Sequence, residues 1–562
     1  MMNRRDFLQV TAATATMMGG SALVGRAAAG QVITQASLLN FKPVGQVTLL
    51  NFTDIHAQLT PLYFREPSIN LGVGEVHGLP PHLTGQEFLS HFDLEGGTPE
   101  AYAFSNKDFA TLAKEYGRIG GIDRMATLVK AIRAERPDNT LLLDGGDTWQ
   151  GSFTSLQTQG EDMVDVMNAL GVDAMTAHWE FTYGTERVQE LIEKLNFPFL
   201  AGNVRDTEWD EEVFDSTAWF DRGGVRIAVI GQAFPYTPVA NPRYMIPSWS
   251  FGIQEKLVQQ RVDDARADGA ELVVLNSHNG FDVDRKLASR ITGLDVILTG
   301  HTHDAIPAVI DVNKTLLVAS GSHGKFLARL DLDIKNGAVA DYSFRLIPIF
   351  SDAIEPDAEM TAVVKEIRAP HEAELSRVIG QTESLLYRRG NFNGTFDDLI
   401  CQALLEERDA QISLSPGFRW GSSLLPGQDI TVEDIYNQTA ITYPNAYRSE
   451  MSGQLIHDIL EDVADNLFNE DPYYQQGGDM VRVGGMSYEI AVQNPIGKRI
   501  SNMTLASSGE RIDPAKTYTV AGWASVNEGT EGPPIYDVVS SYIERKKTIN
   551  VDNAPKIKVT GG

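Results

Sequence analysis

Residues 47–59 read VTLLNFTDIHAQL, an apolar run followed directly by an aspartate, one spacer residue and a histidine. The run has the length and apolar content of a buried β-strand. In open α/β sheets, side chains at the carboxyl ends of strands gather at the edge where binding sites form. The stretch therefore predicts a strand that delivers Asp54 and His56 to a candidate site.

Similar apolar runs recur along the chain, and they alternate with helical patterns up to about residue 350. This alternation predicts an α/β layered domain over residues 45–350. A stretch rich in Pro, Gly and aromatic residues interrupts it and predicts a long inserted loop at about 61–116. The further runs are TLLLDGG (140–146), RIAVIGQ (226–232), ELVVLNS (271–277), LDVILTG (294–300) and TLLVASG (315–321).

The second part of the chain has a different organisation. Residues 351–380 are charged and helix-forming, which predicts a linker helix. From residue 381 to 562, short strands, turns and helices predict a smaller α+β domain.

Polar residues of the kind that bind metals follow several of the apolar runs. Carboxylates and imidazoles without a thiolate suit a divalent metal such as manganese, iron or zinc. D-x-H and H-x-H spacings at a strand end allow both side chains to turn toward one point. These candidates are Asp54 and His56, Asp144 and Asp147, His178, His278, and His301 and His303.

Composition and the N-terminus restrict the location and the partners. Arg4 and Arg5 precede a weakly apolar run that ends in AAA before Gly30, which predicts a twin-arginine export signal at residues 1–29 and a periplasmic location. The net charge of −28 argues against nucleic acid as a partner. A single cysteine, Cys401, excludes an internal disulfide and is expected to be buried. We expect no membrane anchor and a monomer.

The order D-x-H … D-G-G-D … S-H … G-H-T-H resembles the calcineurin-like metallophosphoesterases, and most closely the 5′-nucleotidase branch. Two stretches of the second half, 417–445 and 477–490, are similar to the C-terminal domain of that branch. The resemblance implies a four-layer α/β/β/α domain followed by a smaller α+β domain of 5′-nucleotidase type. It also implies two metals: Asp54, His56 and His303 hold the first, Asp147 bridges, and His178, His278 and His301 hold the second.

Residues 177–182 depart from that family. Its usual motif is G-N-H-E-F-D, whereas this chain reads AHWEFT. His178 replaces an asparagine ligand, Trp179 stands where the family has its catalytic histidine, and Thr182 replaces the aspartate partner. Tryptophan offers only an indole N–H, so the leaving group must depart without a proton from this pair. A sulfur leaving group fits this requirement better than an alkoxide.

The HWEFTYG stretch, the long insertion, the twin-arginine signal and the FRW loop resemble the SoxB family of sulfate-releasing hydrolases. The resemblance implies hydrolysis of a cysteine S-sulfonate or S-thiosulfonate adduct on the SoxYZ carrier, with release of sulfate during thiosulfate oxidation. Two divalent ions are expected, with Mn(II) favoured over Zn and Fe. Asp147, His178 and Trp179 are the expected catalytic residues, and Arg419 and Trp179 are expected to contact the substrate.

Two other functions remain open from the sequence. One is a periplasmic 5′-nucleotidase or related phosphoesterase, which Trp179 and Thr182 disfavour. The other is a non-catalytic binding protein, which the complete metal set disfavours, because unpaired buried carboxylates and imidazoles are costly. Glu180 is expected to orient His178 or a neighbour, and His323 is expected to be structural or exposed.

Overall fold

Two β-sheets form the centre of the first half of the molecule. The computed structural model describes residues 33–551 and 556–560, so the predicted export signal lies outside the described residues. The first sheet has the strand order β13-β12-β1-β2-β3, and the second has the order β10-β11-β9-β8-β6-β5. The strands that precede the candidate ligands run parallel to one another within each sheet: β1 with β2 and β3, and β8 with β9.

Most strands of this half form in apolar runs that are buried along almost their full length, whereas the edge strands at residues 217–222, 310–312 and 338–348 are mostly half-buried or exposed. Their bounds are β1 Val47–Phe52, β2 Thr140–Asp144, β3 Ala174–Met175, β5 Thr217–Arg222, β6 Val225–Gln232, β8 Leu272–Ser277, β9 Val296–Thr299, β10 Ile310–Val312, β11 Thr315–Ala319, β12 Phe326–Lys335 and β13 Ala338–Pro348. A small separate sheet pairs β4 (Arg205–Asp206) with β7 (Trp249–Ser250).

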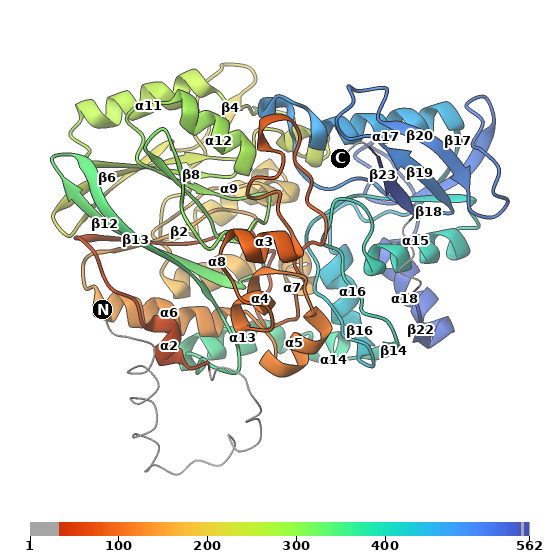
Figure 1. The fold of residues 1–562 in the computed structure, drawn as a ribbon, viewed down its shortest axis with the longest axis horizontal. Coiled ribbons are helices and arrows are strands. Elements are labelled where there is room, and N and C mark those ends of the chain that lie inside the picture. Colours follow the sequence, from red (N-terminus) through yellow and green to blue (C-terminus); the bar gives the residue numbers. More distant parts are fainter. Residues whose placement is uncertain (1–32, 552–555, 561–562) are drawn as a thin grey trace, which may run out of the picture. The chain divides into compact units, whose positions relative to one another are not determined.

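The alternation of side chains along β6 shows how the layers pack. Ile227 and Val229 belong to the core that also contains Leu49 of the first sheet. Ala228 and Ile230 point the other way, into a core shared with helices α11 and α12. A strand with both faces buried in this way lies between two layers. The half therefore has the predicted α/β/β/α architecture, with α11 and α12 outside the second sheet and α6 on the far side of the first (Figure 1).

The helices of this half are α2 Gln35–Leu39, α6 Ile122–Glu135, α7 Phe153–Thr158, α8 Glu161–Leu170, α9 Thr185–Ile192, α10 Thr237–Ala240, α11 Glu255–Ala267 and α12 Phe281–Arg290. The inserted segment is not the loop that its Pro and Gly content predicted. It contains α3 Gly85–His91, α4 Pro99–Phe104 and α5 Phe109–Tyr116. These helices form because Phe88, Tyr102 and Phe109 are buried in the main core.

The segment at 351–380 contains two helices. Helix α13 (Ala358–Arg368) begins at Asp357, whose side chain accepts the N–H of Met360, and α14 (Glu372–Leu375) follows after Pro370. Strand β14 (Val378–Thr382) already belongs to the second half.

The second half is the α+β domain that its short predicted strands, turns and helices indicated. Helix α16 begins at Thr431, which forms a reciprocal capping box with Asp434. Its strands form three sheets, with orders β16-β14-β22, β17-β21-β15-β18 and β20-β19-β23. The bounds are α15 Thr395–Glu407, β15 Ile412–Ser415, β16 Asp429–Thr431, α16 Val432–Thr439, β17 Tyr447–Ser452, α17 Gly453–Phe468, β18 Arg482–Gly484, β19 Met486–Ile490, β20 Ile500–Leu505, β21 Thr517–Gly522, α18 Ile535–Lys546, β22 Thr548–Ile549 and β23 Ile557–Val559.

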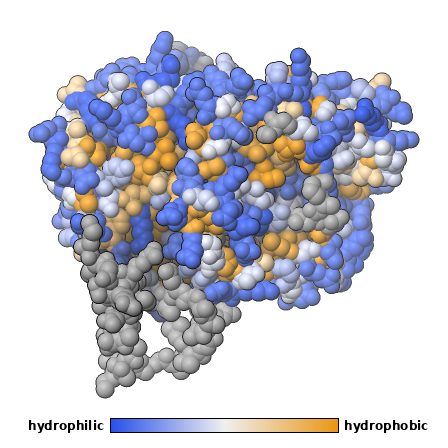
Figure 2. All heavy atoms as spheres, in the orientation of Figure 1, coloured by the Kyte–Doolittle hydropathy of each residue, from blue (hydrophilic) through white to orange (hydrophobic). Residues whose placement is uncertain are grey.

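The surface seen in Figure 2 mixes hydrophilic side chains with smaller hydrophobic patches. Within the described residues, none of the helices combines the length and the apolar character that a bilayer crossing needs. Cys401 is buried in α15, and burial raises the pKa of its thiol to about 12, as expected for a thiol with a structural role.

Candidate functional site

The candidate ligands lie where strands of the two sheets end. On the first sheet, Asp54 and His56 follow β1, Asp147 follows β2, and His178 follows β3. On the second sheet, His278 follows β8, while His301 and His303 follow β9. The carboxyl ends of both sheets therefore supply side chains to one place.

The structure brings all seven of these residues together in two groups. Asp54, His56, Asp147 and His303 form one group, and Asp147, His178, His278 and His301 form the other. Within each group, one nitrogen or oxygen atom per residue lies within 4.8 Å of the others, and every member is buried. Asp147 belongs to both groups, which is the position of a bridging carboxylate.

Distances within the groups are those of side chains that converge on a common centre. The Nε2 of His278 lies 3.1 Å from Oδ2 of Asp147, and Nδ1 of His178 lies 3.2 Å from the same oxygen. In the other group, Nε2 of His303 lies 3.2 Å from Oδ1 of Asp54 and 3.0 Å from Nε2 of His56.

One ring nitrogen that faces the centre of its group would be costly without a metal. His278 Nε2 lies 3.1 Å from Oδ2 of Asp147 but is buried without a hydrogen bond, and a buried polar atom that lacks one destabilises the fold. The donor set of imidazoles and carboxylates suits borderline or hard divalent ions. The residues therefore fit two divalent metal ions bridged by Asp147, an arrangement that occurs in two-metal sites of enzymes.

The charges in the site are strongly coupled. Burial raises the pKa of Asp54. Burial would also raise the pKa of Asp147, but the imidazoles of His178 and His278 hold it well below its usual range. Burial acts to lower the pKa of His278, yet Asp147 and Asp54 raise it to about 10. Asp147 is thus the carboxylate that the surrounding imidazoles hold in its ionised form.

The backbone at the ligands is strained. Positive φ angles of 51–74° occur at five of the seven residues, although residues with a Cβ seldom adopt this conformation. Such strain costs energy and clusters at functional sites, where it aims side chains. The five are Asp54, His56, Asp147, His301 and His303.

Glu180 organises the main chain around the bridging aspartate. Its Oε1 accepts the N–H groups of Thr148 at 2.6 Å and Trp149 at 3.2 Å. Its Oε2 accepts the N–H groups of His178 at 2.7 Å and Asp147 at 3.3 Å. Glu180 therefore orients His178 and its neighbours, as the sequence predicts. It does so through their main-chain N–H groups.

Asp144, which was also considered as a ligand, belongs to neither group. Its carboxylate accepts the hydroxyl of Thr148 and the N–H of Gly146. Burial raises the pKa of Asp144 to about 7. It fixes the turn that carries Asp147.

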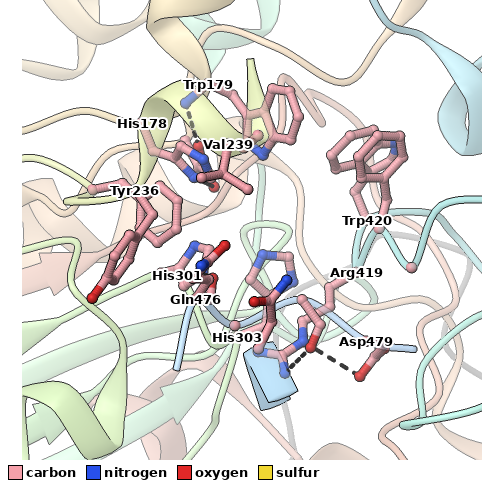
Figure 3. A pocket seen from close by; sticks show the side chains of 18 of the residues that line it. His178, Trp179, Tyr236, Val239, His301, His303, Arg419, Trp420, Gln476 and Asp479 are labelled. Carbon is pink, nitrogen blue, oxygen red and sulfur yellow. Dashed lines mark hydrogen bonds and ion pairs between the residues drawn. The ribbon is translucent and has the colours of Figure 1, made fainter. Parts of the chain in front are cut away.

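A cavity of about 180 Å³ opens beside the two groups. Residues 417–420 and 476–479 of the second half close it on the side opposite the strands. The side chain of Trp179 forms one wall (Figure 3), and the main-chain N–H of Trp179 donates to Oδ1 of Asp147 at 2.7 Å. The rings of Phe418 and Trp420 stack at 4.0 Å, and both meet Trp179 edge-on.

Arg419 also lines the cavity, but its donors are engaged with protein atoms. Its guanidinium donates to the carbonyls of Thr302, at 3.1 Å, and of Gly478, and Nε lies 3.5 Å from Oδ1 of Asp479 (Figure 3). It therefore bridges the metal-ligand loop of the first half and a loop of the second half. Its expected contact with the substrate stays a prediction.

The inserted segment contributes no residue to the lining of this cavity. Asn70, Leu71, Pro81 and His82 instead line an adjoining pocket that shares His301 and Arg419 with it. The insert therefore lies beside this neighbouring pocket, where Nε2 of His82 is 2.6 Å from Oδ2 of Asp282.

Sequence reasoning missed three parts of the site. His323 is buried, and the centre of its ring lies 5.6 Å from the centre of the His56 ring. Its Nε2 accepts the N–H of Gly421. Phe234 stacks on His301 at 4.1 Å. Residues 476–478 approach His301 from the second half. The pair Gly477–Gly478 was the one visible signal, since adjacent glycines mark a close approach of backbone.

Both halves of the chain are similar to known proteins. Residues 378–540 match the family model of the 5′-nucleotidase C-terminal domain. The 5′-nucleotidase of Rattus norvegicus is 26% identical over 323 residues, which are 51% of this chain and 54% of the relative. The chain thus spans about half the length of this relative. The protein UshA of Yersinia enterocolitica is 25% identical over 479 residues, with 75% and 84% coverage.

A solved structure matches over nearly the whole length. The sulfate thiohydrolase SoxB of Thermus thermophilus, in complex with glycerol, has a TM-score of 0.90 and 37% sequence identity. The match covers 93% of this chain and 98% of that one. With the 5′-nucleotidase C-terminal domain and the buried Asp and His groups, the chain is a hydrolase of the metallophosphoesterase superfamily. It belongs to the SoxB family of that superfamily.

Proposed function

We propose that this protein hydrolyses a cysteine S-sulfonate or S-thiosulfonate adduct on a SoxYZ-type carrier and releases sulfate. The observation that carries the proposal is Trp179, a buried indole in the wall of the metal cavity at the place where a proton donor would serve a phosphate ester. Export to the periplasm by the twin-arginine pathway is part of the proposal, and it is supported by the sequence of residues 1–29 alone.

The reaction balances without a general acid. Water adds its oxygen to the sulfonate sulfur, the S–S bond breaks with its electron pair on the carrier sulfur, and sulfate and the two protons of the water are released. The carrier sulfur leaves as a thiolate or persulfide anion, which is stable near neutral pH. Among the residues that line the cavity, Asp479 is paired with Arg482 at 2.9 Å, and Asp147 is a ligand candidate. Neither is free to protonate a leaving group.

The metals, Mn(II) in preference to Zn or Fe, would supply an activated water and neutralise the sulfonate charge. Asp147 would bridge them, with Asp54, His56 and His303 on one side and His178, His278 and His301 on the other. Trp179, with Phe418 and Trp420, would exclude bulk water from the reacting sulfur. Arg419 would hold the sulfonate oxygens with the N–H groups that its two carbonyl contacts leave over.

The aromatic wall also bears on the alternative function, a 5′-nucleotidase. A nucleobase needs an open slot between aromatic faces. Here Phe418 stacks on Trp420, and Trp523 packs edge-on against Phe418 at 5.6 Å. The rings therefore pack against one another and leave no open slot in which a nucleobase could stack. A thin carrier arm fits this cavity better than a nucleotide.

The deciding experiment measures sulfate release from a thiosulfate-conjugated carrier and phosphate release from AMP in parallel. We expect sulfate from the carrier and little or no phosphate. Brisk hydrolysis of AMP without sulfate release would reverse the assignment. The double variant Trp179→His/Thr182→Asp should gain phosphoesterase activity, whereas Thr182→Asp alone, which lacks the imidazole, should not.

A further inference from the structure

One candidate ligand is supported from the other half of the molecule. The Nε2 of His301 lies 3.0 Å from the main-chain oxygen of Gln476, 175 residues further along the chain. In Figure 3 the two residues lie next to each other at the edge of the cavity. Since a carbonyl oxygen only accepts hydrogen bonds, this contact requires a proton on Nε2 and leaves the Nδ1 lone pair for a metal.

Two other ligand candidates are fixed in the same manner, but by their own half. The Nδ1 of His56 faces the carbonyl of Gln150 at 3.2 Å, and the Nδ1 of His278 faces that of Gly145 at 2.6 Å. Both carbonyls belong to the loop after β2, which also carries Asp147. His301 is the candidate among the described ligands whose supporting carbonyl comes from the second half.

The approach of residues 476–478 to His301 requires glycine at position 477. Gly477 has a φ of +72°, and a Cβ built there would lie 2.3 Å from Nε2 of His301. Gly478 has a similar φ of +76°, but its nearest neighbour would be the carbonyl of Gly417 at 3.6 Å. A methyl group at 477 would therefore displace the imidazole, whereas one at 478 would make only an ordinary van der Waals contact.

Contacts on both sides hold this segment in place. The N–H of Gln476 donates to the carbonyl of Asn466 in α17 at 2.9 Å, and that of Asp479 donates to Gly417 at 2.9 Å. The guanidinium of Arg419 joins the carbonyls of Gly478 and Thr302. The segment thus moves with the second half, and it touches the loop that carries His301 and His303.

We propose that residues 476–478 form an outer support of the metal site, so that metal binding by the Asp147, His178, His278 and His301 group depends on the docked second half. Gly477 is a positioning residue in this arrangement, because it acts through the imidazole of His301. The inference rests on the metal assignment of the proposed function and is independent of the substrate.

The test compares Gly477→Ala with Gly478→Ala in the full-length protein. Both substitutions place an alanine at a positive φ, so the strain that they add to the backbone is matched. Mn²⁺ binding is measured by equilibrium dialysis, and the fold by circular dichroism. We expect Gly478→Ala to bind two ions as the wild type does, and Gly477→Ala to bind the second ion tenfold more weakly or worse, as is usual on loss of such a support.

The outcomes distinguish a failure of the proposed role of Gly477 from a failure of the metal assignment. Equal binding of two ions by both variants would overturn the role of Gly477, and a wild type that binds no ion would overturn the metal assignment itself. A second measurement covers a variant that fails to fold. In wild-type protein loaded with Zn²⁺ and labelled with ¹⁵N-histidine, His301 should carry its proton on Nε2, and a proton on Nδ1 would refute the proposal.

Discussion

Asp147 is the residue on which the two ligand groups depend, because it is the member that they share. Its Oδ2 lies 3.1–3.2 Å from nitrogens of His278 and His178, and its Oδ1 accepts the N–H of Trp179. One carboxylate thus faces the candidate metal position with one oxygen and fixes the loop that carries Trp179 with the other. A neutral amide would remove the charge and one of these acceptors.

We therefore expect Asp147→Asn to lower turnover by about 100-fold or more and to reduce the metal content below two ions per chain. Metal analysis and circular dichroism together distinguish this result from unfolding. Asp144→Asn is the matched control, because an amide oxygen can still accept from Thr148 and Gly146. The pKa of Asp144 is already raised to about 7, so a neutral side chain changes little there. Full activity in Asp147→Asn would contradict the bridging role.

The spacing of residues and the family resemblance were enough to find the seven candidate ligands but not their supports. Asp54, His56 and the G-H-T-H residues stand directly after apolar runs, so strand geometry places them at one edge. His323 also follows such a run, yet its role depends on a contact with Gly421 of the other half. Nothing near His323 in the sequence signals that partner.

At the scale of elements, the site is built by the ends of strands and by the turns that follow them. The turn after β2 and the short 3₁₀ segment Trp179–Tyr183 after β3 are joined by the carboxylate of Glu180, which accepts four main-chain N–H groups. A buried anion with four donors is well satisfied, and it holds His178 and Asp147 in register.

Glu180→Gln should break this junction although it keeps the volume of the side chain. The amide nitrogen would face two N–H donors and leave them unpaired, which costs about 2–4 kcal/mol of unfolding free energy. Denaturant unfolding measures the loss, and Mn²⁺ affinity should fall with it. Glu186→Gln on α9 is the control, because Glu186 is exposed and should change stability by less than about 0.5 kcal/mol. Equal stability of the two variants would show that Glu180 is dispensable.

The strands could be predicted better than the inserted helices, for a physical reason. Buried strands such as β8 are continuous apolar runs, which show in the sequence without knowledge of their neighbours. Helices α3, α4 and α5 are short, and isolated helices of that length are unstable. They are formed by burial of Phe88, Tyr102 and Phe109 in a distant core, so the local signals of Pro and Gly suggested a loop.

At the scale of the whole molecule, the site is complete where the two halves meet. The first half supplies the ligands, and residues 417–420 and 476–479 of the second half close the cavity. Other contacts hold this junction: Thr182 pairs with Thr442 at 2.6 Å, and the hydroxyl of Tyr443 donates to the carbonyl of Ala240 at 2.6 Å. Thr182, which stands in the place of the family's aspartate, thus serves the junction between the halves.

Arg419 connects the two halves, and we expect it also to contact the substrate. Two variants separate these roles. Arg419→Ala removes the positive charge, so it should raise KM for the conjugated carrier at least tenfold, which corresponds to about 1.4 kcal/mol of binding energy. It also removes the hydrogen bonds to the carbonyls of Thr302 and Gly478, so it should lower the unfolding temperature. Arg419→Lys keeps a cation but cannot reach the carbonyls of Thr302 and Gly478 together. It should lose stability as the alanine variant does, with a much smaller rise in KM. Steady-state kinetics and thermal unfolding measure the two effects independently. An unchanged KM in Arg419→Ala would assign the guanidinium to the junction alone.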